Sequence, residues 1–300
     1  MKHTLITGAS VGIGKALAYK FATKGHNLIL VARRLELLEE LAQDITTKYG
    51  LDVVVKKADL GNDAEVLKLY EISKSYEIDA FINNAGLGDY SYSWDLDVEK
   101  AIDIVNLNVK ALMTLSLMFI KDYKDKEATL INISSGGGYF VFNKAVTYCA
   151  TKFFVSSFTE GIAQNLKAQN KKLRVKVLAP GATDSEFVKN SELGAAFKGA
   201  DIFDPNAFIS AEQLSEYTYQ LYESDKIVGI VQYNKEFELK DPIFPYGGWN
   251  KHAIYSPFVS FNSLSNNSFF SWLFPFKNPQ KGVSRGERLF KVEGGNVRVS

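Results

Sequence analysis

A tyrosine and a lysine stand four residues apart at Tyr148 and Lys152, in the stretch TYCATK. On a helix this spacing places both side chains on one face. A phenol beside an ammonium can give a proton to a substrate oxygen, because the positive charge lowers the tyrosine pKa from its usual value of about 10. The same spacing occurs at two other places, Tyr70 with Lys74 and Tyr222 with Lys226. Spacing alone therefore does not select the reactive pair.

A second candidate site is the glycine-rich stretch TGASVGIGKALA near the N-terminus, with Gly8, Gly12 and Gly14. It lies between an apolar run and an amphipathic stretch, which predicts a turn from a strand into a helix. Glycines there let the backbone approach a pyrophosphate, and the helix N-terminus offers free N–H groups. The spacing differs from G-x-G-x-x-G, although the mechanics are the same. The alternative interpretation is that the glycines serve only the geometry of the turn.

Two arginines, Arg33 and Arg34, end the next apolar run. In a dinucleotide-binding unit this is the place of the adenosine ribose, where an acidic residue selects a free 2′-hydroxyl. Guanidinium groups there suit a 2′-phosphate instead. The sequence predicts NADP(H), with NADPH bound in preference to NADH. The alternative is that both arginines are the solvated start of the next helix.

Seven short apolar runs alternate with amphipathic stretches along the first 240 residues. The runs are His3–Thr7, Asn27–Ala32, Val53–Val55, Ala80–Ile82, Thr129–Ile133, Val175–Leu178 and Ile227–Val231. This order predicts an α/β fold, a doubly wound parallel sheet of Rossmann type with about seven strands. The stretch from Val98 to Asp122 predicts one long helix. We expect residues 1–240 to form one catalytic domain and residues 241–300 to form an aromatic-rich C-terminal extension.

The chain has 300 residues, and its formal net charge of +1 gives no indication of nucleic-acid binding. Its single cysteine, Cys149, cannot form an internal disulfide and is expected to fill space beside Tyr148. The three histidines are scattered and indicate no metal site. We find no charged-then-apolar leader and no run of about 18 apolar residues. These features predict a cytoplasmic protein.

The motifs together resemble the short-chain dehydrogenase/reductases, over about residues 2 to 235. In family order they are TGASVGIG, Asp59 after the third strand, NNAG at Asn83–Gly86, Asn108 in VNLNVKAL, Ser135 in ISSGGG, and PGATDS at Pro180–Ser185. In this family the catalytic tyrosine follows a strand that ends in serine. Ser135 lies 13 residues before Tyr148, as that pattern requires, whereas the same offset gives Lys57 for Tyr70 and Ile209 for Tyr222. The resemblance therefore selects Tyr148 and Lys152 and predicts that the other two pairs lie on ordinary helix surfaces.

The resemblance implies an oxidoreductase that interconverts a carbonyl and an alcohol. Tyr148 would donate the proton, Ser135 would hold the substrate oxygen, Lys152 would lower the tyrosine pKa and bind the nicotinamide ribose, and Asn108 would anchor a relay water. The implied cofactor-binding residues are Gly8, Ser10, Gly12, Ile13, Gly14, Arg33, Arg34, Asp59, Asn83, Ala85, Gly86, Tyr148, Lys152, Pro180, Gly181, Thr183 and Ser185. The resemblance also implies a homodimer or homotetramer, because relatives usually assemble through long helices.

Simpler roles remain open for several of these residues. Ser134 competes with Ser135, Asn108 could be a helix-interior polar residue satisfied by the backbone, and Asp59 could be a helix N-cap. The stretch from Thr183 to Ser210 is expected to hold a substrate lid. Its four phenylalanines could line an apolar substrate cleft or pack the lid down; they are Phe187, Phe197, Phe203 and Phe208.

The extension after residue 240 has no counterpart in the predicted sheet. Its last part, LFKV-EGGN-VRVS, predicts a small hairpin. Docking on the chain's own core or on a partner subunit is the first interpretation. Contact with a membrane surface is the second, because five aromatic residues cluster near a basic end: Phe269, Phe270, Trp272, Phe274 and Phe276. Binding of another protein is the third. An NADP(H)-binding regulatory or scaffold protein that acts through this tail is the alternative to an enzyme.

Overall fold

The structure is a computed structural model of the chain, and it describes residues 2–198, 204–247, 291–293 and 296–298. The main strands are β1 (Lys2–Thr7), β2 (Asn27–Ala32), β3 (Val53–Lys57), β4 (Glu77–Asn83), β5 (Thr129–Ile133), β6 (Arg174–Ala179), β9 (Val228–Val231) and β10 (Phe237–Lys240). The helices are α1 (Gly12–Thr23), α2 (Leu35–Tyr49), α3 (Asp63–Ser73), α4 (Val98–Val105), α5 (Leu112–Tyr123), α6 (Val146–Ala168), α7 (Glu186–Glu192) and α8 (Ala211–Glu223).

The eight main strands form one sheet in the order β10-β9-β6-β5-β4-β1-β2-β3. Seven of them run parallel and coincide with the seven predicted runs, which confirms the doubly wound fold. The eighth, β10, pairs antiparallel with β9 at the edge and was not predicted. Its four residues, FELK, are too few to show an alternation of apolar and polar residues. Strand order reverses between β1 and β4, where ligands of such sheets bind.

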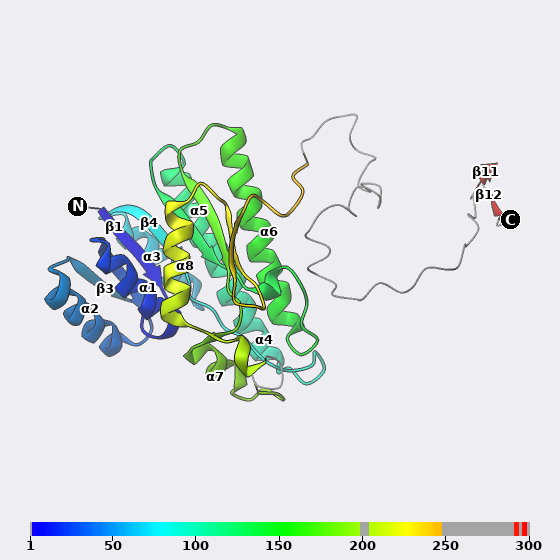
Figure 1. Cartoon of the computed structure of the whole chain (residues 1–300), viewed down its shortest axis with the longest axis horizontal. Helices are drawn as coiled ribbons and strands as arrows, with labels where there is room; N and C mark the ends of the chain where they lie inside the picture. The colour runs from blue at the N-terminus through cyan, green and yellow to red at the C-terminus, as the bar shows by residue number, and fades with distance from the viewer. Residues whose placement is uncertain (1, 199–203, 248–290, 294–295, 299–300) are drawn as a thin grey trace. The chain divides into compact units, whose positions relative to one another are not determined.

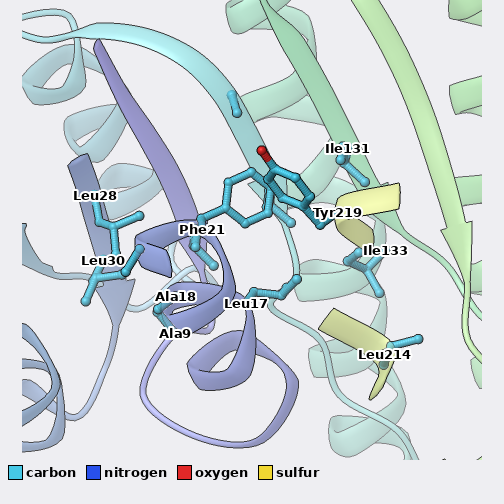
Figure 2. Packing of buried hydrophobic residues seen from close by; sticks show 14 of the residues in the cluster. Ala9, Leu17, Ala18, Phe21, Leu28, Leu30, Ile131, Ile133, Leu214 and Tyr219 are labelled. Carbon is cyan, nitrogen blue, oxygen red and sulfur yellow. The ribbon is translucent and has the colours of Figure 1, made fainter. Parts of the chain in front are cut away.

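Helices cover both faces of the sheet (Figure 1). On one face, residues of α1, α2 and α8 form a buried cluster with the strands. Figure 2 shows Phe21 of α1 meeting Tyr219 of α8 in this layer, and the two rings lie edge to face with centroids 5.2 Å apart. On the other face, α3, α5 and α6 pack their apolar residues against the same strands. The sheet is thus apolar on both faces, as its parallel topology requires.

The predicted long helix is present but contains a π-helical segment, η1 (Asn106–Ala111), between α4 and α5. The continuous helix Val98–Tyr123 is long and apolar enough to cross a membrane by length and composition, which the sequence analysis did not expect. Its inner face is packed in the core, with Ile104, Leu115 and Phe119 buried. Packing within the fold therefore accounts for the apolar residues on that face.

The chain divides into two units, residues 1–247 and 248–300. Residues 241–247, which the sequence analysis placed in the extension, belong to the first unit, and the backbone N–H groups of Ile243 and Phe244 donate hydrogen bonds to Glu160 of α6. In the second unit β11 (Lys291–Glu293) and β12 (Asn296–Arg298) pair antiparallel, which confirms the predicted hairpin. The aromatic cluster from Phe269 to Phe276 lies outside the described residues.

Lys176 is a buried lysine in the middle of β6, with 2% of its surface exposed. Its Nζ donates hydrogen bonds to the carbonyl of Leu221 at 2.7 Å and to that of Ser224 at 2.5 Å, at the C-terminus of α8. A cation at this end of a helix complements the helix dipole and satisfies carbonyls that lack partners. Burial, the largest cause, and Arg174 lower the pKa of Lys176 to about 8.

The lowered pKa of Lys176 predicts that its effect on stability depends on pH. The unfolded chain keeps the ordinary higher pKa and so binds more protons than the folded chain between about pH 8 and 10.5, and stability must rise with pH there. We expect the free energy of unfolding of the native protein, relative to that of Lys176→Met, to increase by about 1–2 kcal/mol from pH 7.5 to 9.5. Urea unfolding at the two pH values measures this difference. A difference that is constant or that falls with pH would contradict the assignment.

Candidate active site

The first feature of the site is a set of hydrogen bonds that joins the ends of β1 and β4 at the switch point. The Thr7 hydroxyl oxygen accepts from the backbone N–H groups of Asn84 and Ala85, at 3.0 and 3.1 Å. The Asn84 amide donates to the carbonyls of Thr7 and Gly8, at 3.0 and 3.3 Å. These contacts fix the glycine turn against the chain that leaves β4.

The predicted glycine turn has the backbone geometry that only glycine adopts readily. Gly8 and Gly12 have φ values of +67° and +53°. A Cβ added to Gly14 would lie 2.1 Å from the carbonyl oxygen of Gly8, so this helical glycine lets α1 start directly against the turn. Ile13 lies in the first turn of α1, and its N–H group is among those that have no partner within the helix. This end of α1 can therefore receive an anion.

Arg33 and Arg34 are both exposed at the end of β2, beside the glycine turn. The Arg34 guanidinium donates to the Ser10 hydroxyl at 3.4 Å and pairs with the Glu186 carboxylate at 2.8 Å. Glu186 is the first residue of α7, in the predicted lid. Arg34 thus lies beside the glycine turn and the N-terminus of α1, which together form the cradle, and its partner there is the Glu186 carboxylate.

Asp59 is exposed and does not cap α3. Asn62 does so, because its side-chain oxygen accepts from the backbone N–H groups of Ala64 and Glu65. The Asp59 carboxylate instead accepts from the backbone N–H of Gly61 at 3.0 Å and closes a short turn. The N-cap interpretation is therefore wrong, and the predicted adenine contact stays a prediction.

Tyr148 and Lys152 lie in the first two turns of α6, and Ser135 lies just after β5. The Lys152 side chain is buried, its Nζ donates to the Ile133 carbonyl at 2.9 Å, and it lies 5.7 Å from the centroid of the Tyr148 ring. Ser135 forms a hydrogen bond with Tyr148. The structure thus brings these three predicted catalytic residues together.

The pKa of Tyr148 differs from the expectation. Burial raises it above its ordinary value, and the hydrogen bond from Ser135 opposes this rise. The Lys152 ammonium is directed to the Ile133 carbonyl, and it is not among the causes of the shift. Burial also lowers the pKa of Lys152 to about 8. The phenol is therefore held in its protonated form, ready to donate.

The two adjacent serines have different surroundings. The Ser134 side chain is buried, donates to the Lys152 carbonyl at 3.0 Å and shares a hydrogen bond of 2.7 Å with Ser156. Ser135 faces Tyr148, and its hydroxyl oxygen also accepts from the backbone N–H of Gly137 at 3.1 Å. This arrangement favours Ser135 over Ser134 as the residue that contacts a substrate.

Asn108 lies in the π-helical segment and is fully buried. Its side chain accepts from the backbone N–H of Leu87 at 2.8 Å and donates to the Leu87 carbonyl at 2.8 Å and to the Thr151 hydroxyl at 3.1 Å. Two of these three hydrogen bonds are to the backbone, as the simpler interpretation of Asn108 predicts. Asn108 holds the loop after β4 against α6, and the water relay stays a prediction.

The NNAG motif divides between the core and the cradle. The side chain of Asn83 is buried and donates to Asn132 at 2.9 Å and to Ser116 at 3.1 Å, so it does not face the glycine turn, and the predicted cofactor contact of this residue stays a prediction. The reason is the alternation of side chains along a strand, which directs Asn83 into the helix layer. Asn84 provides the contact with the glycine turn instead. Gly86 lies where a Cβ would be 3.7 Å from Lys152 Nζ.

The predicted PGATDS loop lies beside the glycine turn. A Cβ at Gly12 would be 3.2 Å from the Cβ of Ser185. The Pro180 carbonyl accepts from the backbone N–H of Gly136 at 2.8 Å, and the Thr183 hydroxyl donates to the Gly181 carbonyl at 3.1 Å. The short strands β7 (Thr183–Asp184) and β8 (Ile209–Ser210) pair and join the two ends of the lid region.

The lid brings aromatic rings to the site. The ring centroid of Phe187 lies 5.5 Å from that of Tyr148, and Phe197 packs edge to face on Tyr92 at 5.0 Å. Phe203 lies outside the described residues. At the end of α7 the Leu193 carbonyl accepts from Lys100 of α4 at 2.5 Å, and the same ammonium pairs with the buried carboxylate of Asp89.

Sequence reasoning missed Tyr90 as a residue of the site. Tyr90 is buried in the loop after β4 and packs in one cluster with Tyr148, Cys149 and Phe142. Loop residues have no periodicity to indicate their direction, so nothing in the sequence identified it. Cys149 is fully buried, which confirms its predicted role as a filler.

The other two tyrosine–lysine pairs do not place a lysine and a tyrosine at the end of β5. Tyr70 is buried rather than on a helix surface, and its hydroxyl hydrogen-bonds to Asp122 and to the Met118 carbonyl, both at 2.9 Å. α8 ends at Glu223, so Lys226 is not on the helix that carries Tyr222. In the described part of the chain no group of three His, Cys, Asp or Glu side chains could hold a metal ion.

Comparison with known proteins gives consistent results. A family model described as short chain dehydrogenase matches residues 2–195. The NADP-dependent 3-hydroxy acid dehydrogenase of Schizosaccharomyces pombe is 28% identical over 220 residues, which cover 72% of this chain and 84% of that protein. A short-chain dehydrogenase from Sphingobium yanoikuyae, solved with NADPH, has 27% identity and a TM-score of 0.68, covering 77% of this chain and 87% of that one. A 3-ketoacyl-(acyl-carrier-protein) reductase from Brucella melitensis, solved with NADH, has 26% identity and a TM-score of 0.64, covering 73% and 90%.

The geometry of the glycine turn predicts opposite effects for two helical glycines. Gly14→Ala must push α1 away from the Gly8 carbonyl, and we expect it to lower the free energy of unfolding by about 1–3 kcal/mol. Gly161→Ala in α6, where a Cβ meets nothing within 4 Å, is the matched control. It is expected to stabilise by about 0.5–1 kcal/mol, because alanine favours the helix. Urea unfolding of both variants measures this, and destabilisation of both by the same amount would contradict the role of Gly14.

Proposed function

The chain belongs to the short-chain dehydrogenase family, and on that premise we propose that it is an NADPH-dependent reductase that interconverts a carbonyl and an alcohol. The observation that carries this proposal is the convergence of Ser135, Tyr148 and Lys152 at the carboxyl end of β5. The cradle made by β1 and the start of α1 lies at the same edge of the sheet.

The cradle residues fit a nicotinamide dinucleotide. The N-terminus of α1 offers its N–H groups to a pyrophosphate, and the absence of a side chain at Gly14 keeps the turn close to the helix. Arg34, at the end of β2, would exchange its partner Glu186 for a 2′-phosphate, with Ser10 beside it. The bound cofactor would supply a hydride to the carbonyl carbon.

The residues at the end of β5 supply the proton in this proposal. The Ser135 hydroxyl holds the carbonyl oxygen next to the Tyr148 hydroxyl, which donates its proton as negative charge develops on that oxygen. The phenolate that remains is costly in a buried place unless a cation is near. With a pKa of about 8, Lys152 is mostly an ammonium at neutral pH and stabilises that phenolate.

The aromatic surroundings support an apolar substrate. Phe187 lies against Tyr148, and Tyr90, Phe142 and Phe197 pack in the same cluster. An apolar wall of this kind binds a substrate through buried surface more than through polar contacts. We propose an aldehyde, a ketone or a 3-oxoacyl compound with an apolar substituent.

A direct test of the proposed reaction follows NADPH consumption by absorbance with a panel of such carbonyl compounds. We expect Tyr148→Phe to lose at least about 100-fold in turnover, because the proton donor is removed while the ring remains. Tyr70→Phe is the matched control, since it deletes a hydroxyl that bonds to Asp122 in another tyrosine–lysine pair. Equal losses in both variants would contradict the role of Tyr148.

The proposed preference for NADPH predicts a selective effect at Arg34. We expect Arg34→Gln to raise the Kd for NADPH about 10- to 100-fold, the value of a charge-assisted hydrogen bond, with little change for NADH. Glu186→Gln removes the present partner of Arg34 and should tighten NADPH binding. Fluorescence titration of both nucleotides measures these constants. Equal weakening of NADH and NADPH in Arg34→Gln would contradict a 2′-phosphate contact.

A further inference from the structure

Glu160 is a fully buried carboxylate that the proposed reaction does not use. It lies on α6, eight residues after Lys152, so both face the interior from the same helix. Among the described residues its partners are hydrogen-bond donors. Its Oε1 accepts from the Tyr139 hydroxyl at 2.6 Å, and its Oε2 accepts from the backbone N–H groups of Ile243 and Phe244 at 2.5 and 2.8 Å. One carboxylate thus joins two segments that are about a hundred residues apart in the chain.

The segment on one side of Glu160 is the chain after β10. Besides its two N–H donors, this segment places the ring of Phe244 on that of Tyr139, stacked with centroids 5.6 Å apart and planes 18° apart. The Tyr246 hydroxyl donates to the Asn165 side chain of α6 at 2.5 Å. Residues 241–247 are therefore seated along α6, with their buried contacts concentrated on Glu160 and Tyr139.

The segment on the other side of Glu160 is the loop that carries Ser135. Tyr139 follows directly after the 3-10 turn η2 (Gly136–Gly138), and its backbone N–H donates to the Gly136 carbonyl at 3.0 Å. On the same loop, Ser134 shares a hydrogen bond of 2.7 Å with Ser156 of α6. A path of hydrogen bonds therefore runs from the segment after β10 through Glu160 to Tyr139, and through the Tyr139 backbone to the turn that follows Ser135.

The loop has no room to shift independently of α6. A Cβ at Gly138 would lie 2.4 Å from Ser134 Oγ, 2.5 Å from Ser156 Oγ and 2.7 Å from the Lys152 carbonyl oxygen. The backbone of the turn is therefore pressed against the helix that carries Tyr148. Close packing of this kind transmits small displacements, because the interior has no free space to absorb them.

We propose that Glu160 is a positioning residue, which makes the place of Ser135 relative to Tyr148 depend on the seating of residues 241–247. The inference rests on the proposed function for its effect on turnover, because only a reacting Ser135 makes its position matter. The network itself exists independently of that function. Residues 241–247 of the same chain lie against this face of α6. Their N–H groups affect the position of Ser135 through the Glu160 carboxylate.

The test combines hydrogen exchange with kinetics on the full-length protein. Glu160→Leu removes both sets of hydrogen bonds, Tyr139→Phe removes only the contact with the loop, and Ile243→Pro removes one N–H donor of the segment. We expect each variant to raise amide exchange at residues 136–139, and to lower kcat for carbonyl reduction, on the order of tenfold, with the KM for NADPH unchanged. Glu160→Gln should rescue both readouts, because its carbonyl can accept from the backbone and its amide can donate to Tyr139.

Tyr123→Phe is the matched control for Tyr139→Phe. It deletes another buried tyrosine hydroxyl, which accepts from the backbone N–H of Ile78 far from the loop. We expect it to lower stability without changing exchange at residues 136–139. Exchange there that rises no more in the three variants than in this control would overturn the proposal, and so would faster exchange with a native kcat. Absence of turnover in the native protein would defeat the proposed function instead, while the exchange measurement would still decide whether Glu160 couples the two segments.

Discussion

The ammonium of Lys152 donates a hydrogen bond to the Ile133 carbonyl at the end of β5, and this buried contact fixes α6 against the sheet. Burial of a lysine ammonium costs desolvation free energy. The contact therefore forms only where the packing of α6 on β5 brings the ammonium within hydrogen-bond distance of the carbonyl. Once it is made, Tyr148 one turn earlier lies beside Ser135, which follows the same strand. The short distance between groups that are far apart in the sequence follows from this one junction.

The cradle depends on a different constraint, which is close contact of backbones. β1 and β4 are held by Thr7 and Asn84, and α1 can start against the turn only because Gly14 has no side chain. The same close packing brings the lid near, since Ser185 lies against Gly12 and Glu186 pairs with Arg34. The two halves of the site are therefore in contact, and a dinucleotide in the cradle would meet both.

Much of this arrangement could be predicted from the sequence, because hydrophobic periodicity sets the strands and glycine spacing sets the turn. All seven parallel strands follow from their apolar runs. The edge strand β10 could not be predicted, because four residues carry too little pattern. The directions of the two asparagine side chains could not be predicted either: the Asn83 side chain bonds within the core, whereas that of Asn84 bonds to the glycine turn. Tyr90 and Glu160 acquire their roles only from tertiary contacts. The rise of the Tyr148 pKa by burial could not be foreseen for a related reason, since the degree of burial is not a property of spacing.

The account depends most on the claim that a hydride passes to a carbonyl carbon at the end of β5. The most direct measurement uses NADPH labelled with deuterium at the transferring position of the nicotinamide, incubated with the full-length protein and the carbonyl panel. Mass spectrometry of the products then locates the label. The account predicts an alcohol with one deuterium on the former carbonyl carbon. NADPH that binds tightly while no carbonyl compound acquires deuterium would contradict it and would favour a nucleotide-binding protein without this chemistry.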